Sequence, residues 1–278
     1  MLTERVIQRI LQGPPRSTVP LVDDAWPSVL LDGPHGPYRV HMNLRSGPAP
    51  VVVAIHGWTS GVAHARNRTE VLTDHGFHVV LLEMVAHGTS TYDGDFTAQC
   101  VVECLEHLLD ELKQGTLSIQ TNDQVVLHGH SLGAYVALGS TKGRHRDNVR
   151  ALLLESPMTC YSPILLDALE KIPVLKKSIL RRLIKRWNIM HRNLKISNLE
   201  DVDVPRWGVP HVPVFVMQAD PDLRLGKEHL DVLIEATPSD LIDVWRSNTL
   251  RHSGTSSHEE RDKALMRWLR AADFIPRC

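Results

Sequence analysis

The stretch Gln124-Val-Val-Leu-His-Gly-His-Ser131-Leu-Gly-Ala-Tyr-Val-Ala-Leu138 joins a strand pattern directly to a helix pattern. At the junction, Gly129-His-Ser131-Leu-Gly133 fits the motif G-x-S-x-G. A sharp turn from strand to helix strains the backbone of the serine and lifts its hydroxyl above the sheet. The N-terminus of the following helix favours negative charge at that place. We therefore predict that Ser131 is a nucleophile, with an ordinary helix N-cap as the alternative.

Strand-like and helix-like segments alternate along the rest of the chain. Short apolar runs such as 51–55 and 78–82 are typical of strands buried on both faces. Alternation of this kind predicts an α/β fold, with a mostly parallel central sheet and helices on both faces. The predicted strands are 28–31, 38–42, 51–55, 78–82, 124–128, 149–154, 212–217 and 241–245, and the predicted helices are 1–12, 62–75, 97–113, 131–139, 226–236 and 257–271.

The alternation stops between residues 157 and 210, where we find no strong strand pattern. We therefore predict a core formed by 1–156 and 211–278 and an inserted helical cap at 157–210. A cap would cover the carboxyl edge of the sheet, where ligands bind in open α/β folds. Within it, apolar residues recur at helical spacing over 175–187, with basic residues on the other face. This helix is either a lid with one solvated face or a basic surface that meets lipid interfaces.

The composition restricts the classes of function. The 278 residues carry 31 Lys+Arg and 32 Asp+Glu, a formal net charge of -1, so binding of nucleic acid by the whole protein is not expected. The four cysteines lack the spacing of a zinc site and are expected to be free thiols, which suits a reducing compartment. The N-terminal segment lacks the apolar run of a signal peptide, and no run is long enough to span a membrane. We expect a cytoplasmic protein.

Acyl transfer at Ser131 requires N–H donors that stabilise a developing oxyanion. The main-chain N–H of Leu132, directly after the nucleophile, is one expected donor. The strand at 51–55 ends in His56-Gly57-Trp58, and we assign the second donor to the main-chain N–H of Trp58.

Three segments together resemble the α/β-hydrolase superfamily. They are His56-Gly57-Trp58, Ala86-His-Gly-Thr-Ser90 and Gly129-His-Ser-Leu-Gly133, and they are most similar to esterases and monoacylglycerol-lipase-like capped hydrolases. The family often has Asp-x-x-Gly-His-Gly-x-Ser in the second segment. Here Glu83 replaces the Asp and Ala86 the first Gly, in a loop that is usually structural.

The resemblance implies a catalytic acid and then a histidine base downstream of the serine. After the strand at 212–217, Asp222 matches the family position of the acid, with Asp220 and Glu155 as alternatives. In the loop before the last helix, His252 is the expected base and His258 the alternative.

The expected function is hydrolysis of a carboxylic ester through an acyl-enzyme intermediate on Ser131. The expected partner is a small-molecule ester or acyl substrate, and neither a metal nor an organic cofactor is needed. Four alternatives remain open because the same residues serve them: a peptidase or amidase, a thioesterase, an acyltransferase, and a ligand receptor without catalysis.

Overall fold

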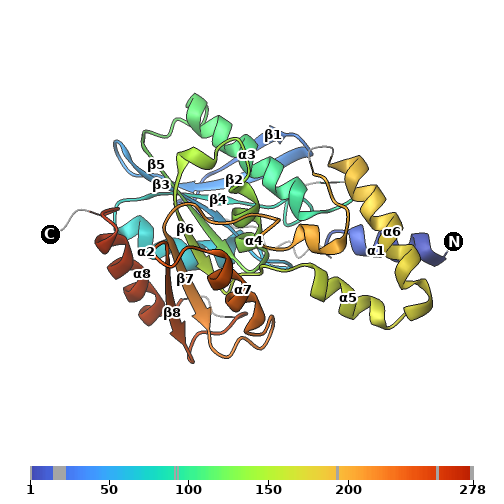
Figure 1. Ribbon diagram of the computed structural model, residues 1–278. Helices are drawn as coiled ribbons and strands as arrows, with labels where there is room; N and C mark the ends of the chain where they lie inside the picture. The colour runs from blue at the N-terminus through green and yellow to red at the C-terminus, as the bar shows by residue number, and fades with distance from the viewer. Residues whose placement is uncertain are drawn as a thin grey trace.

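An eight-stranded sheet forms the centre of the computed structural model, which describes residues 2–14, 23–90, 92, 94–191, 194–254 and 257–275 (Figure 1). The strand order is β1-β2-β4-β3-β5-β6-β7-β8. The pairs β1–β2 and β2–β4 are antiparallel, and all the others are parallel. The strands are β1 (Ser28–Gly33), β2 (Gly36–Asn43), β3 (Ala49–Ile55), β4 (His78–Leu82), β5 (Thr121–His130), β6 (Val149–Glu155), β7 (Val214–Ala219) and β8 (Ile242–Ser247).

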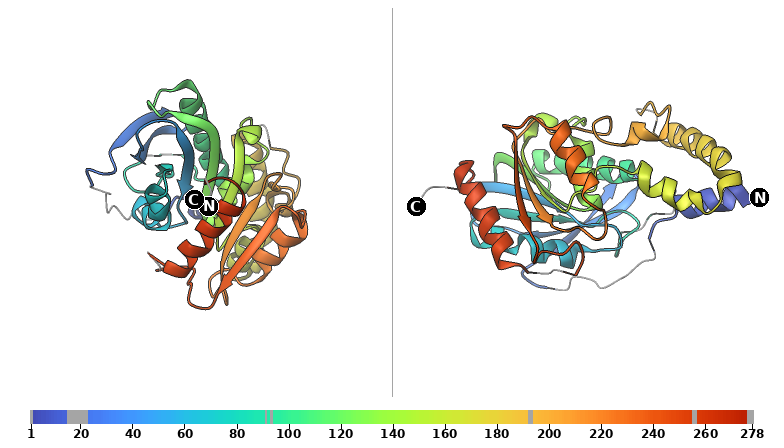
Figure 2. Two further views of the ribbon diagram at one scale, coloured as in Figure 1. Left: turned by 90° about the vertical axis from the view of Figure 1, so that its left-hand side faces the viewer. Right: turned by 60° about the horizontal axis from the view of Figure 1, so that its bottom comes forward.

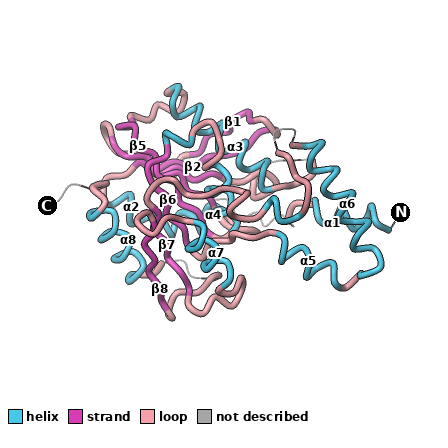
Figure 3. The backbone as a smooth tube through the Cα atoms, in the orientation of Figure 1, coloured by secondary structure: helices cyan, strands magenta, loops and turns pink. Residues whose placement is uncertain are grey.

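Helices cover both faces of this sheet, as the tube in Figure 3 shows. One apolar cluster joins one face to α3, α4 and α7, and a second cluster joins the other face to α2 and α8. The helices are α1 (Leu2–Leu11), α2 (Val62–Asp74), α3 (Ala98–Gln114), α4 (Leu132–Ser140), α5 (Ser162–Glu170), α6 (Pro173–Met190), α7 (Glu228–Ala236) and α8 (Glu259–Ala271), with 3-10 turns η1 (Arg146–Asn148) and η2 (Leu199–Val202).

This architecture is the α/β-hydrolase fold, and it confirms the predicted sheet and its two helical layers. Every predicted strand and helix occurs, with ends shifted by a few residues. The fully buried residues of β4 explain why a continuous apolar run marked a central strand, whereas β1 at the edge is mostly exposed. The ends of α3 are fixed by local signals: Thr97 accepts the N–H of Cys100, and Gly115 follows in a left-handed conformation.

The segment between β6 and β7 forms α5, α6 and η2. Figure 2 shows these helices together with α1 at one end of the molecule. Ile7 and Leu11 of α1 are buried in one apolar cluster with residues of α5, α6 and η2, and α1 packs against α6. The Phe96 N–H also donates to the Leu11 carbonyl at 2.7 Å. The first helix of the chain therefore extends the helical layer formed by 157–210.

The carboxyl ends of the parallel strands meet at one edge of the sheet. Ile55, His130, Glu155, Ala219 and Ser247 end five of these strands, and each is followed by a loop or turn. These loops carry the residues singled out in the sequence, so the topology brings distant parts of the chain together at this edge.

Candidate active site

Ser131 lies in a tight turn between β5 and α4. Its backbone has φ 53° and ψ −115°, a conformation that residues with a Cβ rarely adopt. The Ser131 N–H donates to the Glu155 carbonyl at 3.1 Å, which ties the turn to the neighbouring strand. A Cβ at Gly133 would lie 2.1 Å from the carbonyl oxygen of Ile55, so only glycine lets α4 come this close to β3. The turn therefore requires the second glycine of the motif.

The structure brings Ser131, His252 and Asp222 into one hydrogen-bonded chain. The Ser131 hydroxyl lies 3.0 Å from Nε2 of His252, and Nδ1 of His252 lies 2.8 Å from Oδ2 of Asp222. Asp222 and His252 are buried, while Ser131 is partly exposed. With Nδ1–H donating to the carboxylate, Nε2 carries a lone pair that can accept the serine proton.

The surroundings of Asp222 keep it ionised. Its second oxygen, Oδ1, accepts the main-chain N–H groups of Arg224 at 2.9 Å and Leu225 at 3.0 Å. Burial alone would raise the pKa of this carboxyl, but the hydrogen bonds from His252 and from these two N–H groups outweigh burial and lower the pKa below its ordinary value. The carboxylate is therefore available to orient the imidazole at neutral pH.

The two alternative acids lie elsewhere. The side chain of Asp220 is 54% exposed and faces Arg246 at 3.7 Å. Glu155 is fully buried between two arginines, Arg68 at 2.8 Å and Arg261 at 3.3 Å. Neither carboxylate contacts His252 in the described part of the chain.

His258, the alternative base, is the N-cap of α8. Its Nδ1 accepts the Arg261 N–H at 3.1 Å, and its Nε2 lies 3.0 Å from the hydroxyl of Thr249. The imidazole of His258 thus caps α8 and does not reach the serine.

His130 is a site residue that the sequence did not reveal. Its Nε2–H donates to the main-chain carbonyl of His252 at 2.7 Å, so it links the residue before the nucleophile to the loop of the histidine. The two rings lie 5.2 Å apart. Burial, assisted by the positive charge of Arg68, lowers the pKa of His130 to about 3, so the ring is neutral at pH 7. The only signal in the sequence was its position beside Ser131.

The expected oxyanion donors, Trp58 and Leu132, both line the cavity beside Ser131. Among the described residues, the structure gives neither main-chain N–H an acceptor. Thr59, directly after Trp58, has φ 56°, which is unusual for a β-branched residue and marks a strained turn. Strain of this kind is common in loops that position main-chain groups at functional sites.

The departures from the family pattern in 83–90 are accommodated locally. Oε2 of Glu83 accepts the main-chain N–H groups of Thr89 and Ser90, both at 2.8 Å. Ala86, which stands where the family often has glycine, takes φ 61°. The Glu83 carboxylate thus closes this turn, in which Ala86 adopts a left-handed conformation that is unfavourable for a residue with a Cβ.

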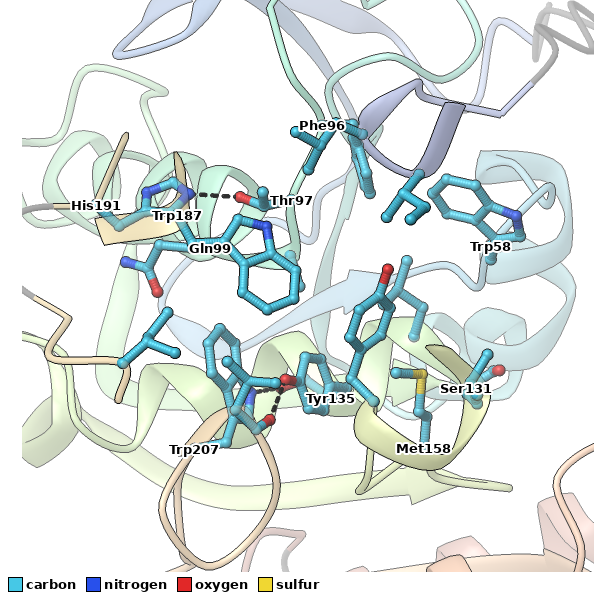
Figure 4. A pocket seen from close by; sticks show the side chains of 18 of the residues that line it. Trp58, Phe96, Thr97, Gln99, Ser131, Tyr135, Met158, Trp187, His191 and Trp207 are labelled. Atoms are coloured by element: carbon cyan, nitrogen blue, oxygen red, sulfur yellow. Dashed lines mark hydrogen bonds between the residues drawn. The ribbon is translucent and has the colours of Figure 1, made fainter. Parts of the chain in front are cut away.

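A cavity of about 480 Å³ extends from Ser131 to the region between α1 and α6. Figure 4 shows Ser131, Met158 and Trp58 on one side of it and His191 and Gln99 on the other. Aromatic and aliphatic side chains form most of the wall, among them Phe96, Tyr135, Trp187, Leu194 and Trp207. A mostly apolar cavity of this size that ends at a nucleophilic hydroxyl is typical of a small-molecule site.

Comparison with family models identifies the family of this chain. A family model, Hydrolase_4, described as "Serine aminopeptidase, S33", matches residues 46–235, which is more than half of the chain. The chain belongs to this family. This membership agrees with the α/β-hydrolase fold, as the resemblance of its three segments predicted.

Similar proteins include a phospholipase and several esterases. Phospholipase YtpA of Bacillus subtilis is 28% identical over 111 residues, which span 40% of this chain and only 41% of that relative. The esterase Pf2001 of Pyrococcus furiosus has a TM-score of 0.65 at 16% identity, covering 93% of this chain and 96% of that one. A serine hydrolase without a lid from Xanthomonas campestris gives 0.60 at 18% identity, covering 93% and 99%. At these identities the solved structures show a common fold.

The described residues also bear on metal binding and on membrane crossing. They contain no group of three or more His, Cys, Asp or Glu that could hold a metal ion. None of the helices among them has the length and apolar character that crossing a membrane demands.

Proposed function

We propose that this protein hydrolyses carboxylic esters with apolar acyl chains through an acyl-enzyme intermediate on Ser131. The observation that carries the proposal is the chain from Asp222 through His252 to the Ser131 hydroxyl, at 2.8 and 3.0 Å, facing an apolar cavity. The similarity to a protein named a phospholipase supports an ester of a lipid-like acid as the substrate class.

The proposed cycle follows from this geometry. His252 accepts the proton of Ser131 as the oxygen attacks the ester carbonyl, and Asp222 stabilises the imidazolium that forms. The main-chain N–H groups of Leu132 and Trp58 hold the oxyanion. His252 then protonates the leaving alcohol, which departs. Water, deprotonated by the same imidazole, attacks the acyl enzyme and releases the acid.

The cavity wall favours an ester over the N-terminus of a peptide. An aminopeptidase must hold a charged α-amino group close to the scissile bond, which calls for a carboxylate in the site. Among the described residues that line the cavity, none is Asp or Glu, and Arg224 is a cation. A protonated amine would therefore meet apolar surface and a like charge, whereas an acyl chain would bury its methylene groups favourably.

Fluorophosphonate labelling and a substrate panel test the proposal. We expect the probe to label Ser131 and Ser131→Ala to abolish labelling and turnover while keeping the melting temperature. We expect p-nitrophenyl esters to be cleaved faster than anilides, thioesters or aminoacyl anilides. Absence of labelling would favour a receptor without catalysis, and preferential cleavage of aminoacyl anilides would favour a peptidase.

A further inference from the structure

The exposed side of α6 is basic. The helix contains six Lys or Arg residues and no Asp or Glu. Within the described ranges of the chain, only Arg186 among these forms an ion pair, with Glu4 at 2.7 Å and with Asp95 at 2.5 Å. The five cations without an ion-pair partner there are Lys176, Lys177, Arg181, Arg182 and Lys185.

Apolar side chains stand at both ends of this row of cations on α6. Val174 is 92% exposed and Ile189 is 64% exposed. Together with Lys177, Arg181 and Lys185 they follow the spacing of one helix face. The opposite face is buried in the helical layer through Ile179, Leu183 and Trp187. Val174 and Ile189 are thus exposed to solvent beside the cations and do not join the apolar cluster on the other side of the helix.

The helix α1 repeats this pattern beside α6. Leu2 is 63% exposed, and Arg5 and Arg9 are exposed, while Ile7 and Leu11 are buried against the same layer. Figures 1 and 2 show α1 and α6 at the same end of the molecule, away from α8. Basic and apolar side chains therefore mark the outside of this end on two helices. On α5, the third helix of this end, Asp167 and Glu170 are exposed, which limits the basic surface to α1 and α6.

The same two helices close the cavity. Ile10 and Leu11 of α1 and Trp187 of α6 belong to its wall, so the basic surface lies on the outside of the elements that cover the acyl site. We propose that the basic surface, formed by Arg5, Arg9, Lys177, Arg181, Arg182 and Lys185 with Leu2, Val174 and Ile189, docks onto an anionic lipid bilayer.

A bilayer fits the chemistry of this surface better than other polyanions do. Cations attract the headgroups of anionic lipids, and exposed apolar side chains beside them enter the boundary of the acyl chains. The phosphate backbone of a nucleic acid offers no partner for those apolar side chains. The inference rests on the proposed function in one respect. Docking brings a lipid ester of the bilayer close to the cavity that we propose binds its acyl chain.

Sedimentation with vesicles tests the docking independently of turnover. The chain of 278 residues is mixed with vesicles of phosphatidylcholine alone or of phosphatidylcholine with phosphatidylserine. We expect binding to the anionic vesicles that weakens as salt is added. Neutralising three cations of α6 should lower the partition coefficient for the anionic vesicles about 100-fold. The variant is Lys177→Gln with Arg181→Gln and Arg182→Gln, and its matched control on α3 and α8 is Lys113→Gln with Arg267→Gln and Arg270→Gln.

A second variant, Val174→Thr, tests the apolar contribution because it keeps the size and charge of the side chain, and it should also weaken binding to the anionic vesicles. All variants should cleave dissolved p-nitrophenyl butyrate like the wild type, because none of these residues touches the site. Absence of ester turnover in the wild type as well as in the variants would count against the proposed function and not against docking. Equal binding by the two triple variants, no binding to anionic vesicles, or tighter binding to duplex DNA at the same salt concentration would overturn the inference.

Discussion

At the scale of single residues, Asp222 and Asp220 share one turn but have different surroundings. Asp222 accepts hydrogen bonds on both oxygens, whereas Asp220 is half exposed beside Arg246. We expect Asp222→Asn to lower kcat about 10³–10⁴-fold, because an amide no longer stabilises the imidazolium or fixes its tautomer. Asp220→Asn should leave kcat unchanged. Steady-state kinetics with an ester substrate decides between them, and equal losses would show that the hydrogen-bond geometry does not identify the acid.

His130 offers a second prediction at this scale, because it holds the loop of His252 through one buried hydrogen bond. Replacing it by leucine leaves the His252 carbonyl without its donor, which costs about 1–3 kcal/mol of stability. A shift of the imidazole by a fraction of an ångström should also lower kcat about 10–100-fold with little change in KM.

The variant His130→Gln is the control for this prediction. Its amide N–H can donate to the same carbonyl, so it should recover most of the lost kcat. If leucine and glutamine reduce kcat equally, or if only the melting temperature changes, His130 supports the fold and does not position the base.

At the scale of elements, Glu155 at the end of β6 joins α2 to α8 through Arg68 and Arg261. Burial alone would raise the pKa of Glu155, but the two guanidinium groups outweigh burial and lower it from 4.5 to about 2. A carboxylate whose pKa is lower in the folded state than in the unfolded state stabilises the fold. This stabilisation is fully present at pH values above the pKa of the unfolded state. That contribution disappears as the pH falls from about 4.5 to about 2.

We therefore predict that Glu155→Gln destabilises the protein by about 3–5 kcal/mol at neutral pH, because it leaves buried arginines without a counter-charge. Its stability should also fall less between pH 4.5 and pH 2 than that of the wild type. Urea unfolding at several pH values measures both effects, with the exposed Glu235→Gln as the control. Parallel pH profiles for the wild type and Glu155→Gln would contradict the prediction.

Most elements were predictable because their signals are local. A parallel strand buried on both faces is a continuous apolar run, and a turn that needs glycine on both sides of a serine carries its own motif. Contacts between distant segments were not predictable in this way. Nothing in the sequence near His130 indicates that it donates to a carbonyl 122 positions later. Likewise, the amphipathic pattern of α1 predicts a helix but not that the helix packs on α6.

At the scale of the whole molecule, the sheet edge and the helical layer enclose the cavity between them. Figure 4 shows Ser131 and His191 on opposite sides of it, and Leu194, a further wall residue, donates its main-chain N–H to the His191 carbonyl at 2.9 Å. The helical layer, together with Gln99 of α3, therefore forms the side of the cavity opposite the nucleophile. Residues on that side should therefore determine which acyl-chain lengths the cavity accepts.

Acyl-chain length is the property that tests this arrangement. Each methylene buried in the cavity contributes about 0.8 kcal/mol, or about fourfold in kcat/KM, so the wild type should improve along a series of p-nitrophenyl esters until the cavity is filled. Leu194→Trp fills the end near His191. We expect Leu194→Trp to lower kcat/KM for the long esters and to leave kcat/KM for the acetyl ester unchanged. The optimal chain length should be shorter in Leu194→Trp and longer in Leu194→Ala than in the wild type. A uniform loss over the whole series would indicate a folding defect, and an unchanged optimum in both variants would show that the acyl chain does not reach the helical layer.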